Sequence, residues 1–218
     1  PPAVNQFSWD KKHVASWNFG LKRRATATWT FDDSNLYLCF RDVSDATPMI
    51  NHGKVVNQLF KTGDAVAFEL RTKPDDATPR VIAGDLRLLV TVFEGKPIAI
   101  LYRYKVAGTE NPVEFASPVT TTKIDVVKVL DAARVAIDRR ASAYDVRVAV
   151  PLAELGFKPE PGKTYLCDVG VIHSDSQGQI NELRMYWSNR ATGIVSDLAI
   201  EATIDPRRWG RWELKIED

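Results

Sequence analysis

The sequence predicts an all-β protein: an antiparallel β-sandwich of roughly a dozen strands, in which residues 1–218 form a single domain. Short segments alternate between apolar and polar residues, and clusters of Pro, Gly, Asp and Asn separate them. No window of about 11 residues has the periodicity of an amphipathic helix. A chain of 218 residues with 44% hydrophobic residues is long enough to build one substantial core.

Residues 24–31 form the first clear strand. Alanines, Trp29 and Phe31 occupy one face and threonines the other, so we expect Trp29 in the core. A turn signal at 32–35 leads into residues 36–43. The opening of that segment is apolar on both faces, which is typical of a central strand.

Residues 65–71 repeat the alternation, which places their apolar side chains inward and Glu69 and Arg71 outward. A hairpin follows, with residues 86–93 and 98–105 on either side of a Gly-containing turn. Further strands are expected near residues 123–129, 133–138, 143–150, 164–173, 182–188, 198–204 and 211–216.

Two long stretches, 45–62 and 104–122, have only weak patterns. We expect them to be loops at the edge of the sandwich. Loops of this length are often functional.

The strictest alternation lies in residues 143–150. The apolar face carries Val146, Val148 and Val150. We predict that these valines are buried and that Arg147, on the other face, is not. Pro151 cannot donate to a ladder and ends the strand, and residues 152–155 have room for at most one helical turn.

Composition excludes several classes of protein. The balance of 29 basic and 28 acidic residues argues against a nucleic-acid binder, which usually carries a basic surplus. No apolar run approaches the roughly 18 residues needed to span a bilayer. Cys39 and Cys167 each lie in a predicted strand, as buried free thiols or as a disulfide between the two strands, and no Cys/His cluster has zinc-site spacing.

Three segments resemble the family 9 carbohydrate-binding modules and the related DOMON domains. The segments are Leu36–Asp45 (LYLCFRDVSD), Thr62–Leu70 (TGDAVAFEL) and Val148–Leu155 (VAVPLAEL). The tail from Leu183 to Asn189 and at Trp209–Gly210 is similar to the C-terminal part of the bacterial family 9-like group. The similarity runs from about Trp9 to Leu214, and the order and spacing of these motifs are more specific for the fold than for a ligand.

The resemblance implies a non-catalytic module that binds a polysaccharide or oligosaccharide. It also implies structural calcium, attachment to other domains of a polysaccharide-processing protein, and a secreted or periplasmic location. Sugar binders of the family are expected to have an acidic residue directly after the GD-x-V segment, where this chain has Ala67. That departure favours an alternative, a structural or interaction sandwich without sugar binding.

Trp187 is the leading candidate for a sugar contact. A sugar presents an apolar C–H face that packs on an indole, and its hydroxyls need polar partners such as Asn189, two residues further on. Trp209 and Trp17 are the next candidates, while Arg184 is expected on the face opposite Trp187. The alternative for each tryptophan is a packing role in the core.

Asp42, Asp45 and Asp64 lie near predicted strand ends and are the leading candidates for calcium, which binds through six to eight oxygen ligands. The alternative role for these aspartates is to cap turns.

A DOMON-type haem b cytochrome domain for electron transfer is a second functional class. Met49 or Met185, together with His173, would then ligate the iron. The chain has only two Met and three His residues, which makes haem the weaker hypothesis. No G-x-S-x-G motif or other catalytic constellation is present, so we do not expect an enzyme.

Overall fold

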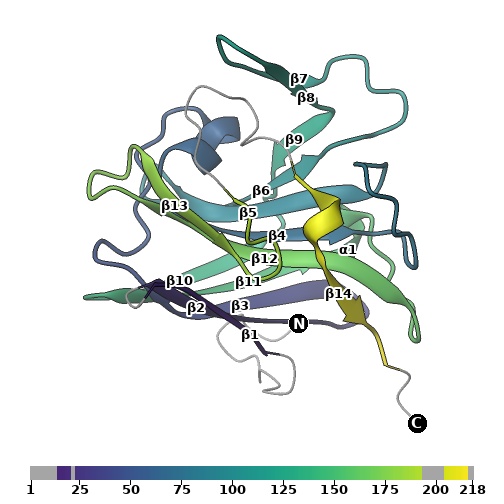
Figure 1. The fold of residues 1–218 in the computed structure, drawn as a ribbon, viewed down its shortest axis with the longest axis horizontal. Helices are drawn as coiled ribbons and strands as arrows, with labels where there is room; N and C mark the ends of the chain where they lie inside the picture. Colours follow the sequence, from purple (N-terminus) through teal and green to yellow (C-terminus); the bar gives the residue numbers. More distant parts are fainter. Residues whose placement is uncertain (1–13, 21–22, 193–203, 216–218) are drawn as a thin grey trace.

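The computed structural model describes residues 14–20, 23–192 and 204–215, and it confirms an antiparallel β-sandwich. Two layers of strands lie one above the other in Figure 1. The described residues contain fourteen strands and three short helical segments: η2 (Val56–Lys61), α1 (Leu152–Leu155) and η4 (Pro206–Arg208). None of the described helices is long and apolar enough to cross a membrane. The strand expected near 198–204 lies mostly outside the described residues.

The first layer is a five-stranded sheet in the order β1-β2-β3-β11-β10. Its strands are β1 (Val14–Phe19), β2 (Arg23–Phe31), β3 (Asn35–Ser44), β11 (Ala143–Pro151) and β10 (Arg134–Arg140). The central position predicted for residues 36–43 is correct, because β3 pairs with β2 on one side and β11 on the other.

The second layer is a seven-stranded sheet in the order β13-β12-β4-β5-β6-β9, with β14 pairing to β12. Its strands are β4 (Ala65–Arg71), β5 (Asp85–Phe93), β6 (Lys96–Arg103), β9 (Val126–Val129), β12 (Thr164–Ser174), β13 (Asn181–Tyr186) and β14 (Gly210–Glu213). The predicted hairpin is β5–β6, closed by Glu94 and Gly95, which both have positive φ.

The interior cluster, as we call the apolar core between the two sheets, contains the valines predicted from β11. Val146, Val148 and Val150 are fully buried, whereas Arg147 is partly exposed and forms an ion pair with Asp138. The predicted alternation is therefore confirmed in both directions.

A second apolar cluster covers the outer face of the seven-stranded sheet. It contains Leu59 and Phe60 of η2 and Phe115 and Ile124 of the small hairpin β7 (Val113–Ala116) and β8 (Thr121–Ile124), which stands at the top of Figure 1. Both segments fall at least partly in stretches that we expected to be irregular. They fold because their apolar side chains are buried against the sheet.

Burial of this outer face corrects another expectation. Glu69 and Arg71 do point away from the interior cluster, but their exposed fractions are only 3% and 0%. Both cysteines are buried free thiols: Cys39 lies in the five-stranded sheet and Cys167 in the seven-stranded one.

Candidate functional site

Asp168 of β12 positions the segment that follows β13. Its Oδ1 accepts a hydrogen bond from the Ser188 amide at 2.9 Å, and its Oδ2 accepts one from the Asn189 amide at 2.8 Å. The Trp187 amide donates to the carbonyl of Val169 at 2.8 Å. These bonds hold Trp187 and Asn189 where the sheet ends.

Trp187 is half-buried at the edge of the interior cluster. One part of its ring packs on Gly210, where an added Cβ would lie 2.3 Å from Trp187 Cζ3, so β14 needs glycine at this position. The side-chain oxygen of Asn189 accepts a hydrogen bond from the Ala191 amide at 3.1 Å. Of the four predicted ligand contacts, these two are the ones that retain exposed surface.

Trp187 stands at one end of a chain of four half-buried rings, which we call the edge aromatic cluster. The ring centroids of Trp29 and Trp187 are 6.0 Å apart, those of Trp29 and Trp212 6.3 Å, and those of Phe31 and Trp212 5.8 Å. We expected Trp29 in the core, and it packs against the interior cluster while keeping partial exposure. Tilted and edge-to-face contacts at these distances are favourable.

Arg184 occupies the face opposite Trp187, as predicted. Its Nη2 donates to the carbonyl of Phe60 at 2.9 Å, on the outer side of the seven-stranded sheet.

The structure does not support Trp17 and Trp209 as exposed ligand contacts. Trp17 is 4% exposed, and its Nε1 donates to the carbonyl of Met185 at 3.1 Å. Trp209 is 6% exposed, and its Nε1 donates to Glu69 Oε2 at 2.6 Å. Both indoles are packing residues because their polar nitrogens find partners inside the protein.

A buried row of charges crosses the outer face of the seven-stranded sheet, and sequence reasoning missed it. Asp168, Glu69 and Arg87 are neighbours on β12, β4 and β5. Glu69 Oε1 accepts from Arg87 Nε at 3.1 Å and from Nη2 at 2.9 Å. Burial, and then the charge of Glu69, raises the pKa of Asp168 to about 7. The available signal was the opposite charges of Glu69 and Arg87 on neighbouring strands; we had expected Glu69 to point outward.

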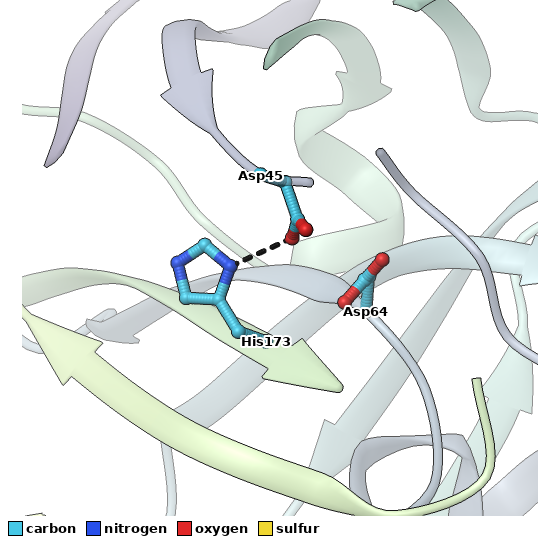
Figure 2. A group of neighbouring side chains, drawn as sticks. All are labelled: Asp45, Asp64 and His173. Atoms are coloured by element: carbon cyan, nitrogen blue, oxygen red, sulfur yellow. Dashed lines mark hydrogen bonds and ion pairs between the residues drawn. The ribbon is translucent and has the colours of Figure 1, made fainter. Parts of the chain in front are cut away.

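Two of the three predicted calcium ligands do come together. Figure 2 shows Asp45 and Asp64 beside His173, and one candidate ligand atom from each lies within 4.8 Å of the others. Asp42 does not join them: its side chain is 65% exposed and pairs with Arg140 at 3.0 Å. The third member is His173, whose alternation with Val169 and Val171 places it on the inner face of β12.

Hydrogen bonds hold this group together. His173 Nδ1 and Asp45 Oδ2 are 2.8 Å apart. Burial raises the pKa of Asp45, but hydrogen bonds from His173 and Thr47, with the charges of His173 and Arg23, outweigh burial and hold that pKa below its ordinary value. Burial, and then the charge of Asp45, raises the pKa of Asp64 to about 7.

The residues of this group do not fit calcium. Calcium binds through oxygen atoms, and one of the three available side chains offers nitrogen. The oxygens of Asp45 accept from Thr47 and His173 and pair with Arg23, and those of Asp64 accept from Ile50 and Ser174. These oxygens are already engaged by donors of the chain itself.

The proposed haem ligands do not fit an iron site either. Met49 and Met185 are 0% and 4% exposed and pack in the interior cluster. His173 is 0% exposed as well, so none of the three side chains is more than 4% exposed.

No family model matches the sequence, and no curated protein matches it. The fold is similar to that of a family 9 carbohydrate-binding module from Caldicellulosiruptor kristjanssonii. The structure of that module with glucose has a TM-score of 0.55 and 13% identity, covering 99% of this chain and 87% of that one. The structure with cellotriose has a TM-score of 0.54 and 14% identity, covering 99% and 86%. The predicted resemblance to the family 9 modules is confirmed at the level of the fold.

Proposed function

We propose that this chain is a non-catalytic carbohydrate-binding module that binds a polysaccharide or oligosaccharide. The observation that carries the proposal is the fold. Over 99% of the chain it is similar to a family 9 module whose structures hold glucose and cellotriose. Fold alone does not define function. The proposal therefore also needs side chains suited to a sugar.

The edge aromatic cluster and Asn189 supply such side chains. Trp187 is backed by Gly210 and Trp29, which hold its ring in a defined orientation. A rigid indole contacts a sugar at little entropic cost, and Asn189 adds an amide group two residues away. We infer that Trp187 is the stacking ring of the binding site and that Asn189 hydrogen-bonds a hydroxyl.

The wider setting of the module follows from the family resemblance. We infer that the module is part of a larger secreted or periplasmic protein that processes polysaccharide. In such a protein the module contributes binding, and a neighbouring domain contributes catalysis.

Titration calorimetry with cello-oligosaccharides tests the proposal. Trp187→Ala is expected to weaken binding by about 1–3 kcal/mol, by analogy with the stacking of nucleic-acid bases on aromatic side chains. Phe19→Ala is the matched control, because Phe19 is an aromatic residue with 62% exposure outside the cluster. Circular dichroism checks that both variants fold.

Two outcomes would contradict the proposed site. If Trp187→Ala folds and binds as tightly as the unmodified chain, the sugar contacts lie elsewhere. If no oligosaccharide or polysaccharide binds the unmodified chain, the function itself is wrong.

The second candidate function is a structural or protein-interaction sandwich without sugar binding. Ala67 favours it, because this residue is 1% exposed and lies between Gly170 and Leu89 on the outer face of the seven-stranded sheet. The second apolar cluster covers this face, so no acidic side chain at position 67 is available to a hydroxyl. A negative result across a glycan array would favour this candidate.

A further inference from the structure

We propose that Arg23 takes the place of a metal ion in the buried group formed by Asp45, Asp64 and His173. Its guanidinium neutralises the buried carboxylate of Asp45, so the group is stable without calcium. Calcium is expected for the family, but this chain surrounds Asp45 and Asp64 with donors of its own.

The guanidinium of Arg23 lies where a cation is needed. Its Nη1 is 3.2 Å from Asp45 Oδ1 and donates to the carbonyl of Ser44 at 3.4 Å. The side chain of Asp45 is 1% exposed, whereas that of Arg23 is 25% exposed. Arg23 therefore neutralises a fully buried carboxylate while keeping part of its own contact with water, which lowers the cost of burying the pair.

Each remaining carboxylate oxygen of the group already accepts at least one hydrogen bond from the chain itself. Asp64 Oδ1 accepts from the amide of Ser174 at 2.7 Å and from its hydroxyl at 2.9 Å, and Oδ2 accepts from the Ile50 amide at 2.8 Å. Asp45 Oδ1 also accepts from the Thr47 amide at 3.0 Å. A calcium ion would have to displace these donors and lie against the guanidinium, and repulsion between two cations at such a separation is strong away from bulk water.

The group joins the two layers of the sandwich. Arg23 begins β2, and Asp45 directly follows β3, both in the five-stranded sheet. Asp64 directly precedes β4, and His173 lies near the end of β12, both in the seven-stranded sheet. The contact between His173 and Asp45 links the two layers, and the ion pair between Arg23 and Asp45 links the start of β2 to the end of β3.

Thermal unfolding with and without metal tests the inference. The unmodified chain is expected to have the same Tm in a chelator and in millimolar calcium, because a ligand that binds the native state raises Tm and calcium does not bind. Arg23→Gln is expected to lower Tm by about 5 °C or more, since a buried carboxylate loses its counter-ion in a domain of this size. Arg24→Gln is the matched control, because Arg24 is the next residue on β2 and is exposed.

Two results would overturn the inference. One is a calcium-dependent rise in the Tm of the unmodified chain. The other is an Arg23→Gln variant as stable as Arg24→Gln. If Arg23→Gln does not fold, the metal response of the unmodified chain still decides the point, and Arg23→Lys, which keeps the charge, is expected to fold and to ignore calcium.

Discussion

Glu69→Gln removes the negative charge from the centre of the buried row on the outer face of the seven-stranded sheet. Glu69 and Arg87 are 3% and 4% exposed. One carboxylate oxygen accepts both Arg87 bonds, and the other accepts the 2.6 Å bond from the indole of Trp209. The substitution keeps the size of the side chain, removes its charge and replaces one acceptor oxygen by an NH2 group.

The expected loss of stability is large. Removing one partner of a buried ion pair costs about 3–5 kcal/mol, because the other charge stays buried without its counter-ion. The glutamine oxygen still accepts one bond, so we do not add a separate cost for Trp209. A loss of about 3–5 kcal/mol is a substantial part of the roughly 5–15 kcal/mol that holds a typical domain folded.

Urea denaturation followed by tryptophan fluorescence measures this loss. The control is Glu114→Gln on β7, where the carboxylate is 53% exposed and lies 3.6 Å from Lys123. An exposed pair of this kind contributes about 1 kcal/mol or less. The double variant Glu69→Gln/Arg87→Met is expected to regain part of the loss, since it removes the unbalanced charge.

The reasoning would be refuted by equal losses in Glu69→Gln and Glu114→Gln. That result would mean that water screens the buried Glu69–Arg87 pair as effectively as the exposed Glu114–Lys123 pair. A double variant with the sum of the two single losses would show that Glu69 and Arg87 are not coupled.

Three further predictions concern other parts of the chain. Val148→Asp is expected to abolish soluble folding, whereas Arg147→Glu should change the unfolding free energy by about 1 kcal/mol or less; comparable tolerance at both positions would contradict the β11 register. Because the folded-state pKa of Asp168 is raised to about 7, well above its unfolded value, ionisation of this group lowers stability as pH rises from about 4 to about 7, by at most about 1.4 kcal/mol per pH unit. The denaturation midpoint should therefore fall more steeply with rising pH for the unmodified chain than for Asp168→Asn. Equal slopes for the two proteins would contradict the raised pKa of Asp168. Gly210→Ala should destabilise the protein and alter the fluorescence of Trp187, because the new methyl group overlaps the ring; an unchanged spectrum would show that the ring is not held there.

The sequence by itself determined the fold class, most strands and the side chains that face the interior. Alternation is a local property, so Val146, Val148 and Val150 could be assigned to a buried face without knowing their partners. The same argument correctly separated Arg184 from Trp187. The sequence also named Asp45 and Asp64, with Asp42, as candidate calcium ligands because they lie near predicted strand ends, and the structure brings the first two together.

Only the tertiary structure decided what covers the other face of each strand. Alternation divides a strand into two faces but does not say which segments pack on the second, so Glu69 and Arg71 were expected in solvent and are buried. For the same reason Trp209 was a candidate contact and is a packing residue. His173 joins Asp45 across 128 residues of sequence, and Arg23 meets them from another strand. Such contacts depend on how the two sheets stack, which no local pattern encodes.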